Sequence, residues 1–220
     1  ADTIDAREYE HLEHDKNGNI YFFPKNDNID IIKYDGKIYS SIKISQPDTC
    51  AFAAISKSFA ATINGKMVIA YSTATSFRVN YQNKWYTYNK TNGYAGERIL
   101  NIAIYKSSVV FCTEARLYEW SNGKLQFNIN AIIPPSFLPV RGMTDEPSTT
   151  KGNTTTWMFG NTWVGYIEND RFTCINNSLN FIQNYDSGDD LILGDGNNRV
   201  FISTHLSCYY LEKKKKKIFN

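Results

Sequence analysis

The feature of this chain that most constrains its fold is a pattern that recurs five times. An aromatic-rich stretch runs into a tight turn that ends on a basic residue, and a second short stretch follows. The five copies span residues 31–42, 77–89, 116–129, 164–176 and 208–220. Successive separations are 47, 40, 47 and 44 residues, counted between Lys37, Lys84, Lys124, Arg171 and Lys215. Short strands that recur about every 40–50 residues are typical of β-propeller blades.

The repeat predicts the architecture of the whole chain. Its 220 residues make five units of about 44 residues, which is the length of a four-stranded blade. Because one blade has two apolar faces, it needs neighbouring blades to cover them. We therefore predict one all-β domain, a five-bladed β-propeller-like array of four-stranded antiparallel blades, with a β-sandwich or jelly roll as the alternative. The expected units are residues 7–45, 50–89, 99–129, 131–176 and 179–220.

Local signals place the turns and most of the strands. Tight hairpins are expected at 35–36, 64–65, 122–123, 169–170 and 195–196, where Asn, Asp and Gly supply the left-handed conformations that such turns need. The stretch at 7–14 is compatible with an innermost strand or with the start of a helix. Four prolines make most of 131–153 a loop, and 137–143 is the expected inner strand of the fourth unit.

Two segments resemble the repeats of sensor-type β-propellers. They are LEHDKNGNIYFFPKNDNIDIIKYDGKI (12–38) and GDGNNRVFISTHLSCYYLEKKKKKIF (194–219). In each, a turn of Asp, Asn and Gly precedes a strand, and a second strand carries an aromatic residue before a polar hairpin. The resemblance is one of turns and strands, so it implies a fold rather than a chemistry.

Charge and cysteine content limit the partners. The net charge is only +2, which favours neither a nucleic-acid partner nor membrane insertion. The lysine run at 213–217 is expected to be a solvated turn or edge strand, with a phosphate contact as the alternative. Of the four cysteines, Cys112, Cys174 and Cys208 lie in expected strands among apolar neighbours, so buried free thiols are expected, although the even count also allows disulfides.

Candidate metal ligands have ordinary turn or surface explanations. His11 and His14 would face the same way on a helix but opposite ways on a strand. An oxygen-rich loop holds Asp15, Asn17 and Asn19, and a second one holds Asp186, Asp189, Asp190 and Asp195. Neither loop has the complete calcium-binding pattern, so turn formation is the expected role. We expect no metal, no cofactor and no catalytic set, since the three histidines suggest no Ser-His-Asp arrangement.

Aromatic side chains are the remaining candidates for binding. Aromatic residues make up 15% of the chain and alternate between strand faces, so some are expected at the surface. The candidate binding residues are Trp85, Tyr86, Trp120, Trp157 and Trp163. Rings beside Asn and Thr suit sugar stacking or a protein interface, whereas burial between blades is the competing explanation.

These observations favour a non-enzymatic binding or structural module. We expect a component of a virus or phage particle, or of an extracellular assembly, that binds a protein or a glycan and is compatible with oligomeric assembly. A virion or extracellular location is favoured over the cytoplasm. A carbohydrate-active enzyme and a secreted effector or toxin that binds a host protein are the alternatives.

Overall fold

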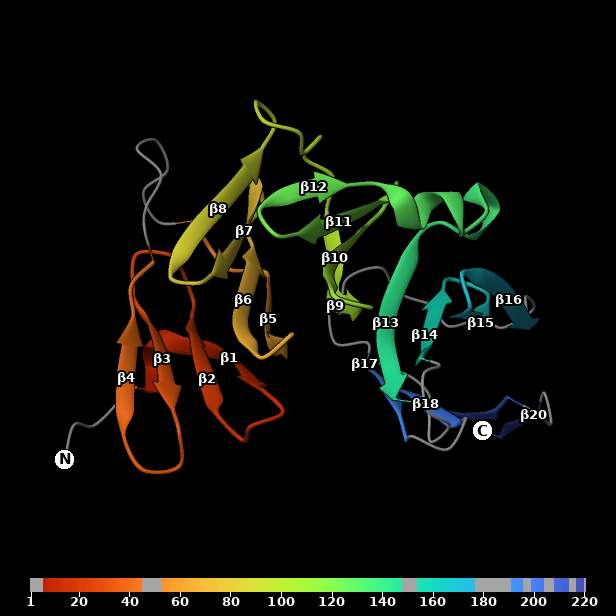
Figure 1. Cartoon of the computed structure of the whole chain (residues 1–220), viewed down its shortest axis with the longest axis horizontal. Helices are drawn as coiled ribbons and strands as arrows, with labels where there is room; N and C mark the ends of the chain where they lie inside the picture. Colours follow the sequence, from red (N-terminus) through yellow and green to blue (C-terminus); the bar gives the residue numbers. More distant parts are fainter. Residues whose placement is uncertain are drawn as a thin grey trace. The chain divides into compact units, whose positions relative to one another are not determined.

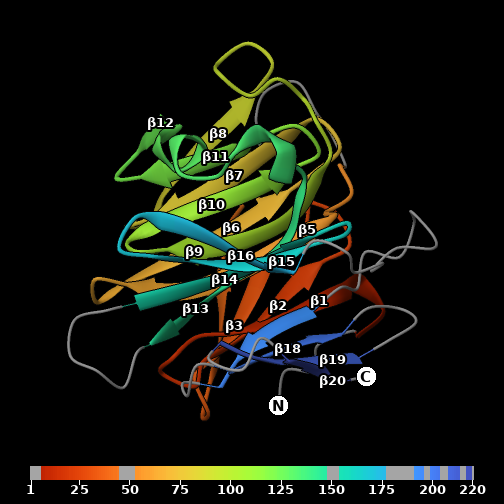
Figure 2. The same cartoon turned by 90° about the vertical axis from the view of Figure 1, so that its right-hand side faces the viewer.

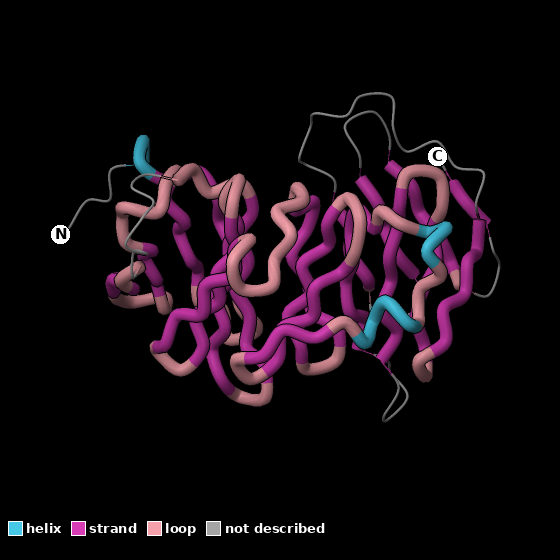
Figure 3. Tube along the Cα trace, turned by 90° about the horizontal axis from the view of Figure 1, so that it is seen from above, coloured by secondary structure: helices cyan, strands magenta, loops and turns pink. Residues whose placement is uncertain are grey.

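The computed structural model describes residues 6–44, 53–147, 154–176, 191–195, 199–203, 208–213 and 217–219. Its regular structure is almost entirely strand, with three short 3-10 helices, η1 (Ala6–Glu8), η2 (Asn128–Ala131) and η3 (Pro135–Phe137). Figure 3 shows these helical turns among strands and tight loops. Main-chain contacts divide the chain into two compact units, Ala1–Arg98 and Ile99–Asn220.

The first unit contains two four-stranded antiparallel sheets (Figure 1). The strands of its first sheet, in spatial order, are β1 (Tyr9–His14), β2 (Ile20–Pro24), β3 (Ile31–Tyr34) and β4 (Tyr39–Ile42). Those of its second sheet are β5 (Lys57–Ile63), β6 (Lys66–Ser72), β7 (Ser76–Tyr81) and β8 (Lys84–Asn89). Each strand pairs with the next one in the sequence, as expected when tight turns join them.

The two sheets of the first unit pack face to face. Their shared core combines alternate residues of the first sheet, such as Tyr21, Phe23 and Ile31, with Ile69 and Tyr71 of the second. Because side chains of a strand alternate between faces, the residues between them, such as Phe22 and Ile32, lie on the opposite face of the first sheet.

The second unit contains three sheets of the same kind (Figures 1 and 2). The third sheet comprises β9 (Ile99–Tyr105), β10 (Ser108–Thr113), β11 (Leu117–Ser121) and β12 (Lys124–Gln126). The fourth comprises β13 (Val140–Pro147), β14 (Thr154–Gly160), β15 (Val164–Glu168) and β16 (Arg171–Asn176). The fifth comprises β17 (Leu191–Gly194), β18 (Arg199–Ser203), β19 (Cys208–Glu212) and β20 (Lys217–Phe219).

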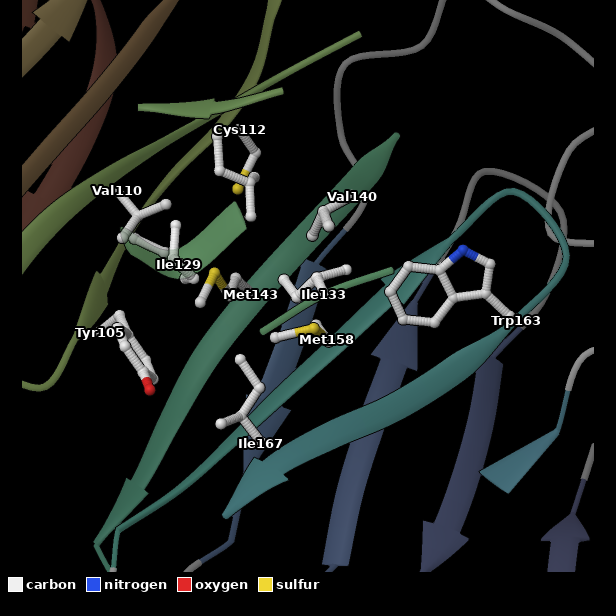
Figure 4. Close-up of a cluster of buried hydrophobic side chains, with 12 residues drawn as sticks. Tyr105, Val110, Cys112, Ile129, Ile133, Val140, Met143, Met158, Trp163 and Ile167 are labelled. Atoms are coloured by element: carbon white, nitrogen blue, oxygen red, sulfur yellow. The ribbon is translucent and has the colours of Figure 1, made fainter. Parts of the chain in front are cut away.

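Two apolar cores lie between these sheets. In the core between the third and fourth sheets, Figure 4 shows Val110 and Cys112 near Met143, with Met158 and Trp163 further along. Between the fourth and fifth sheets, Trp157 and Phe159 pack with Val200 and Ile202. Both faces of the fourth sheet are therefore covered, one by the third sheet and the other by the fifth.

The predicted fold class is confirmed: the described residues are all-β and form five four-stranded antiparallel sheets in a propeller-like array, not two facing sheets. The single domain over the whole chain stays a prediction. Residues 9–14 form a strand, so the helical alternative is wrong. The strand expected at 137–143 begins only at Val140 and continues to Pro147. A proline is tolerated there because β13 is an edge strand of the fourth sheet. The expected strand at 179–186 lies outside the described residues.

Candidate functional site: the hairpin cleft and the aromatic face

A cleft of about 320 Å³ opens between hairpins of the third and fourth sheets. The β9–β10 hairpin contributes Tyr105 and Lys106, and β14 contributes Thr154 and Thr156. The end of β15 and the turn that follows contribute Ile167, Asn169 and Asp170. We call this site the hairpin cleft, and all of it belongs to the second unit.

One carboxylate organises the hairpin cleft. The Oδ1 atom of Asp170 accepts a hydrogen bond from the Tyr105 hydroxyl at 2.7 Å and another from the Lys106 ammonium at 2.6 Å. These two bonds hold the pKa of Asp170 below its usual value, the Lys106 bond contributing most. Burial and the bond to Asp170 both raise the pKa of Tyr105, so its hydroxyl stays protonated and remains a donor at neutral pH.

The turn that carries Asp170 fixes its position. Asn169 and Asp170 have φ values of 51° and 59°, the left-handed conformation of both central residues of a type I′ hairpin turn. Lys106, in the opposing hairpin, has a φ of 56°. Asn and Asp adopt this conformation more readily than most residues, so the sequence favours this local geometry.

A second candidate surface is the face of the first sheet that points away from the second sheet. Four aromatic rings lie on it: Tyr9 contacts Phe22, Phe22 contacts Tyr39, and Tyr39 stacks on Tyr34 with ring centres 4.7 Å apart. Cross-strand pairing places Leu12 beside Phe22. We call this surface the aromatic face, and it consists of Tyr9, Leu12, Ile20, Phe22, Ile32, Tyr34 and Tyr39.

The aromatic face is open to solvent. Leu12 is 65% exposed and Tyr39 is 50% exposed, and Ile38, in the turn before β4, is 64% exposed. Large apolar side chains seldom gather in the open on a monomer without a binding role. The fifth sheet shows a related feature on the face that points away from the fourth sheet, where Leu191, Leu193 and Phe201 are each about half exposed.

Two of the five binding residues predicted from the sequence are half-buried, and three are buried. Trp85 is half-buried, contacts Tyr71 at 5.5 Å between ring centres and donates its indole hydrogen to the Lys43 carbonyl. Tyr86 is also half-buried, with the Lys84 ammonium 5.1 Å from its ring centre.

The other three predicted rings, Trp120, Trp157 and Trp163, are buried. Trp157 and Trp163 belong to the cores between sheets, so burial between blades, the competing explanation, describes them. Ligand binding by the five predicted residues stays untested, but these three rings offer no surface on which a ligand could stack.

Sequence reasoning missed the residues of both sites. Tyr105 and Lys106 stand 65 and 64 residues before Asp170, so only the folded sheets bring them together. The signal that could have revealed the aromatic face is the alternation of Ile20, Phe22, Ile32 and Tyr34 with core residues, which shows apolar side chains on both faces of the first sheet.

The histidine and oxygen-rich motifs have structural explanations. His11 and His14 point to opposite faces of β1, and a His11 ring nitrogen lies 3.2 Å from the Ile55 carbonyl oxygen. Both oxygens of Asp15 accept hydrogen bonds within its own turn or from Tyr21, which confirms the expected turn role. Within the described residues no three metal-binding side chains converge. Asp186, Asp189 and Asp190 lie outside the described residues.

The remaining expectations concern the lysine run and the cysteines. Lys213 bonds to Glu168 at 2.7 Å and lies over the Tyr166 ring, so this lysine contacts the fourth sheet rather than being freely solvated. Among the described cysteines, all free, only Cys112 is buried; Cys174 is half-buried and Cys208 is exposed, so the expectation of three buried thiols is wrong for the last two. The described residues include no helix long and apolar enough to cross a bilayer.

Comparisons with known proteins identify a fold rather than a sequence family. A scan against protein-family models and a search of curated proteins both find no match. Among solved structures, the extracellular domain of the putative one component system BT4673 from B. thetaiotaomicron is similar, with a TM-score of 0.58 and 11% identity over 98% of this chain and 28% of that chain. A chain of the mitotic checkpoint complex has a TM-score of 0.56 and 7% identity over 99% of this chain and 64% of that chain.

These neighbours are propeller-type proteins, and the likeness shows that the present chain shares their fold. This chain spans about 28% of the length of the first neighbour. Fold alone does not assign a ligand, because propellers carry many unrelated functions.

Proposed function

We propose that the chain is a non-enzymatic binding module that docks a partner protein on the aromatic face. The observation that carries the proposal is the exposure of Leu12, Ile38 and Tyr39 beside a run of contacting rings. Interface centres are enriched in aromatic residues and depleted in charge, and this surface has that composition. Aliphatic side chains among the rings favour a protein over a sugar, which prefers rings flanked by polar groups.

The opposite face of the first sheet indicates what kind of surface binds there. The opposite face of the same sheet is covered by the second sheet, with aromatic and aliphatic side chains meeting across the interface. We therefore infer that the partner presents an apolar surface, such as the face of a β-sheet. The polar rim includes Glu10 and His14, which point to the same side as Leu12.

We place this binding in an extracellular or particle assembly. The Asn-, Tyr- and Thr-rich composition supports this setting, and one propeller neighbour is an extracellular domain.

The test uses site-specific photo-crosslinking followed by binding measurements. A photoreactive phenylalanine replaces Leu12 in one variant and Phe127 in another, because Phe127 is similarly exposed (48%) but lies on the second unit. We expect the position-12 probe, and not the position-127 probe, to capture a partner. The double variant Leu12→Asp/Tyr39→Ser should then weaken binding of the purified partner at least tenfold, whereas Phe127→Ser should change it less than twofold.

Two outcomes would contradict this function. A captured partner whose affinity is unchanged in Leu12→Asp/Tyr39→Ser would show that another surface binds it. Selective binding of the aromatic face to a glycan array, lost in the same variant, would replace the protein partner with a sugar. Melting temperatures of both variants should match that of the parent chain, since exposed substitutions usually change stability little.

A further inference from the structure

The hairpin cleft has the chemistry of a site for a small neutral ligand rich in hydroxyl groups. We propose that it binds a single sugar ring or a comparable polyol. This site lies on the second unit and is independent of the aromatic face, so either proposal can fail without the other.

Size is the first argument. A volume of about 320 Å³ stands at the lower end of the range for small-molecule sites, about 300–1,000 Å³. The cleft is therefore suited to one ring-sized ligand rather than to an extended chain. Its lining is mostly polar, with Ile167 providing an apolar contact.

The second argument is the balance of charge and hydrogen-bonding groups. Lys106 and Asp170 carry opposite charges and are paired, so the lining residues have no net charge. Around this pair stand hydroxyl groups of Thr154 and Thr156 and the amide of Asn169. A hydroxyl both donates and accepts hydrogen bonds, so a neutral polyol can satisfy such a mixed set without leaving a charge unpaired.

The third argument is an oriented acceptor. Asp170 accepts bonds from Tyr105 and Lys106 through Oδ1 alone, and its Oδ2 atom accepts none from the residues that the structure describes. The side chain is 57% exposed, so this carboxylate is accessible to a ligand hydroxyl. Hydrogen bonds to a carboxylate are about twice as strong as neutral ones, and a rigid turn reduces the entropy lost on binding.

The experiment uses the full chain and a panel of methyl glycosides of glucose, galactose, mannose and N-acetylglucosamine. Binding is followed by amide chemical shifts in a two-dimensional NMR titration. We expect at least one glycoside to bind with a millimolar dissociation constant and to shift the amides of Tyr105, Asn169 and Asp170. The affinity should be the same in 50 mM and 500 mM NaCl, because a neutral ligand is insensitive to screening.

Asp170→Asn is the informative variant, because asparagine adopts a positive φ readily and keeps the size of the side chain. It should weaken glycoside binding at least tenfold. Asp35→Asn is the matched control, since Asp35 also lies in a hairpin turn, is exposed and belongs to the other unit. This control should leave the affinity unchanged.

Three results would overturn the proposal. No shift of the cleft amides by any glycoside up to 50 mM would exclude a sugar site. Equal affinity in Asp170→Asn would remove the oriented carboxylate from recognition. Preferential binding of free amino acids, weakened by salt, would mean that Lys106 and Asp170 bind a zwitterion instead.

Discussion

A buried ion pair between the first two sheets gives the sharpest test of how the first unit is held together. Arg78 of β7 and Asp27 of the β2–β3 loop are separated by 2.9 Å, with 1% and 0% of their side chains exposed. Arg78 also donates to the Tyr71 hydroxyl at 2.8 Å. The main-chain N–H of Asp27 donates to the Ala53 carbonyl, and the Asp27 carboxylate accepts a hydrogen bond from the Ala53 N–H. Replacing Arg78 with methionine leaves a buried carboxylate without its counter-ion.

The expected loss of stability follows from the geometry. Two unit charges 2.9 Å apart attract by about 6 kcal/mol at an effective dielectric constant of about 20. Removing one partner of a buried pair typically costs about 3–5 kcal/mol, because the other charge is left desolvated. We expect Arg78→Met and Asp27→Asn each to lower the free energy of unfolding of the first unit by about 3–5 kcal/mol. The double variant should lose at least 2 kcal/mol less than the sum of the two single losses.

Urea unfolding followed by tryptophan fluorescence measures these losses. Trp85 is the only tryptophan of the first unit and contacts Tyr71 directly, so its emission reports on this interface. The Trp85→Phe variant identifies its share of the signal. The exposed pair Lys106–Asp170 is the control, and its removal should change stability little, because solvent screens the attraction between exposed charges. Single losses below 1 kcal/mol, or a double variant that loses the full sum, would refute the reasoning.

Three further predictions test burial, close contact and titration. Burial raises the pKa of Cys112 to about 12, so a thiol reagent at pH 8 should label exposed Cys208 in the folded chain and Cys112 only after unfolding; labelling of folded Cys112 would contradict its burial. A methyl group at Gly160 would overlap the Trp163 ring nitrogen, so Gly160→Ala should cost about 1–3 kcal/mol in thermal unfolding, and an unchanged melting temperature would exclude that contact. Burial raises the pKa of Asp15, but hydrogen bonds from Asn19, Tyr21 and the turn outweigh burial, so the pKa is lowered overall. The stability that Asp15 contributes should therefore be complete above about pH 4 and lost as the pH falls through the lowered pKa, and Asp15→Asn should remove that pH dependence.

Local signals in the sequence predict the hairpins well because turn chemistry is local. Asn122 and Gly123 have φ values of 49° and 82°, as an Asn-Gly turn requires. In the turn between β7 and β8, Gln82 and Asn83 have φ values of 54° and 61°, although Gln-Asn is not a typical turn sequence. The strand patterns on either side still predict the position of this turn.

Burial could not be predicted because it depends on contacts between distant parts of the chain. Arg78 stands in an alternating strand where a charged residue is expected to face solvent, and its partner Asp27 lies 51 positions earlier. The same limit applies to the tryptophans, whose exposure is decided by whether a neighbouring sheet covers their face. Alternation identifies which residues share a face, but not which face is covered.

The repeat itself shows why the first sheet is the best candidate for docking. The residue directly after the basic residue of the hairpin is Ile38 in the first repeat, Trp85 in the second and Phe172 in the fourth. Trp85 packs against the core shared with the first sheet, and Phe172 packs against Trp163. Ile38, at the same repeat position, is 64% exposed. In the second and fourth repeats this position is covered by apolar side chains, whereas in the first it is open, and its chemistry suits an apolar cover of the same kind.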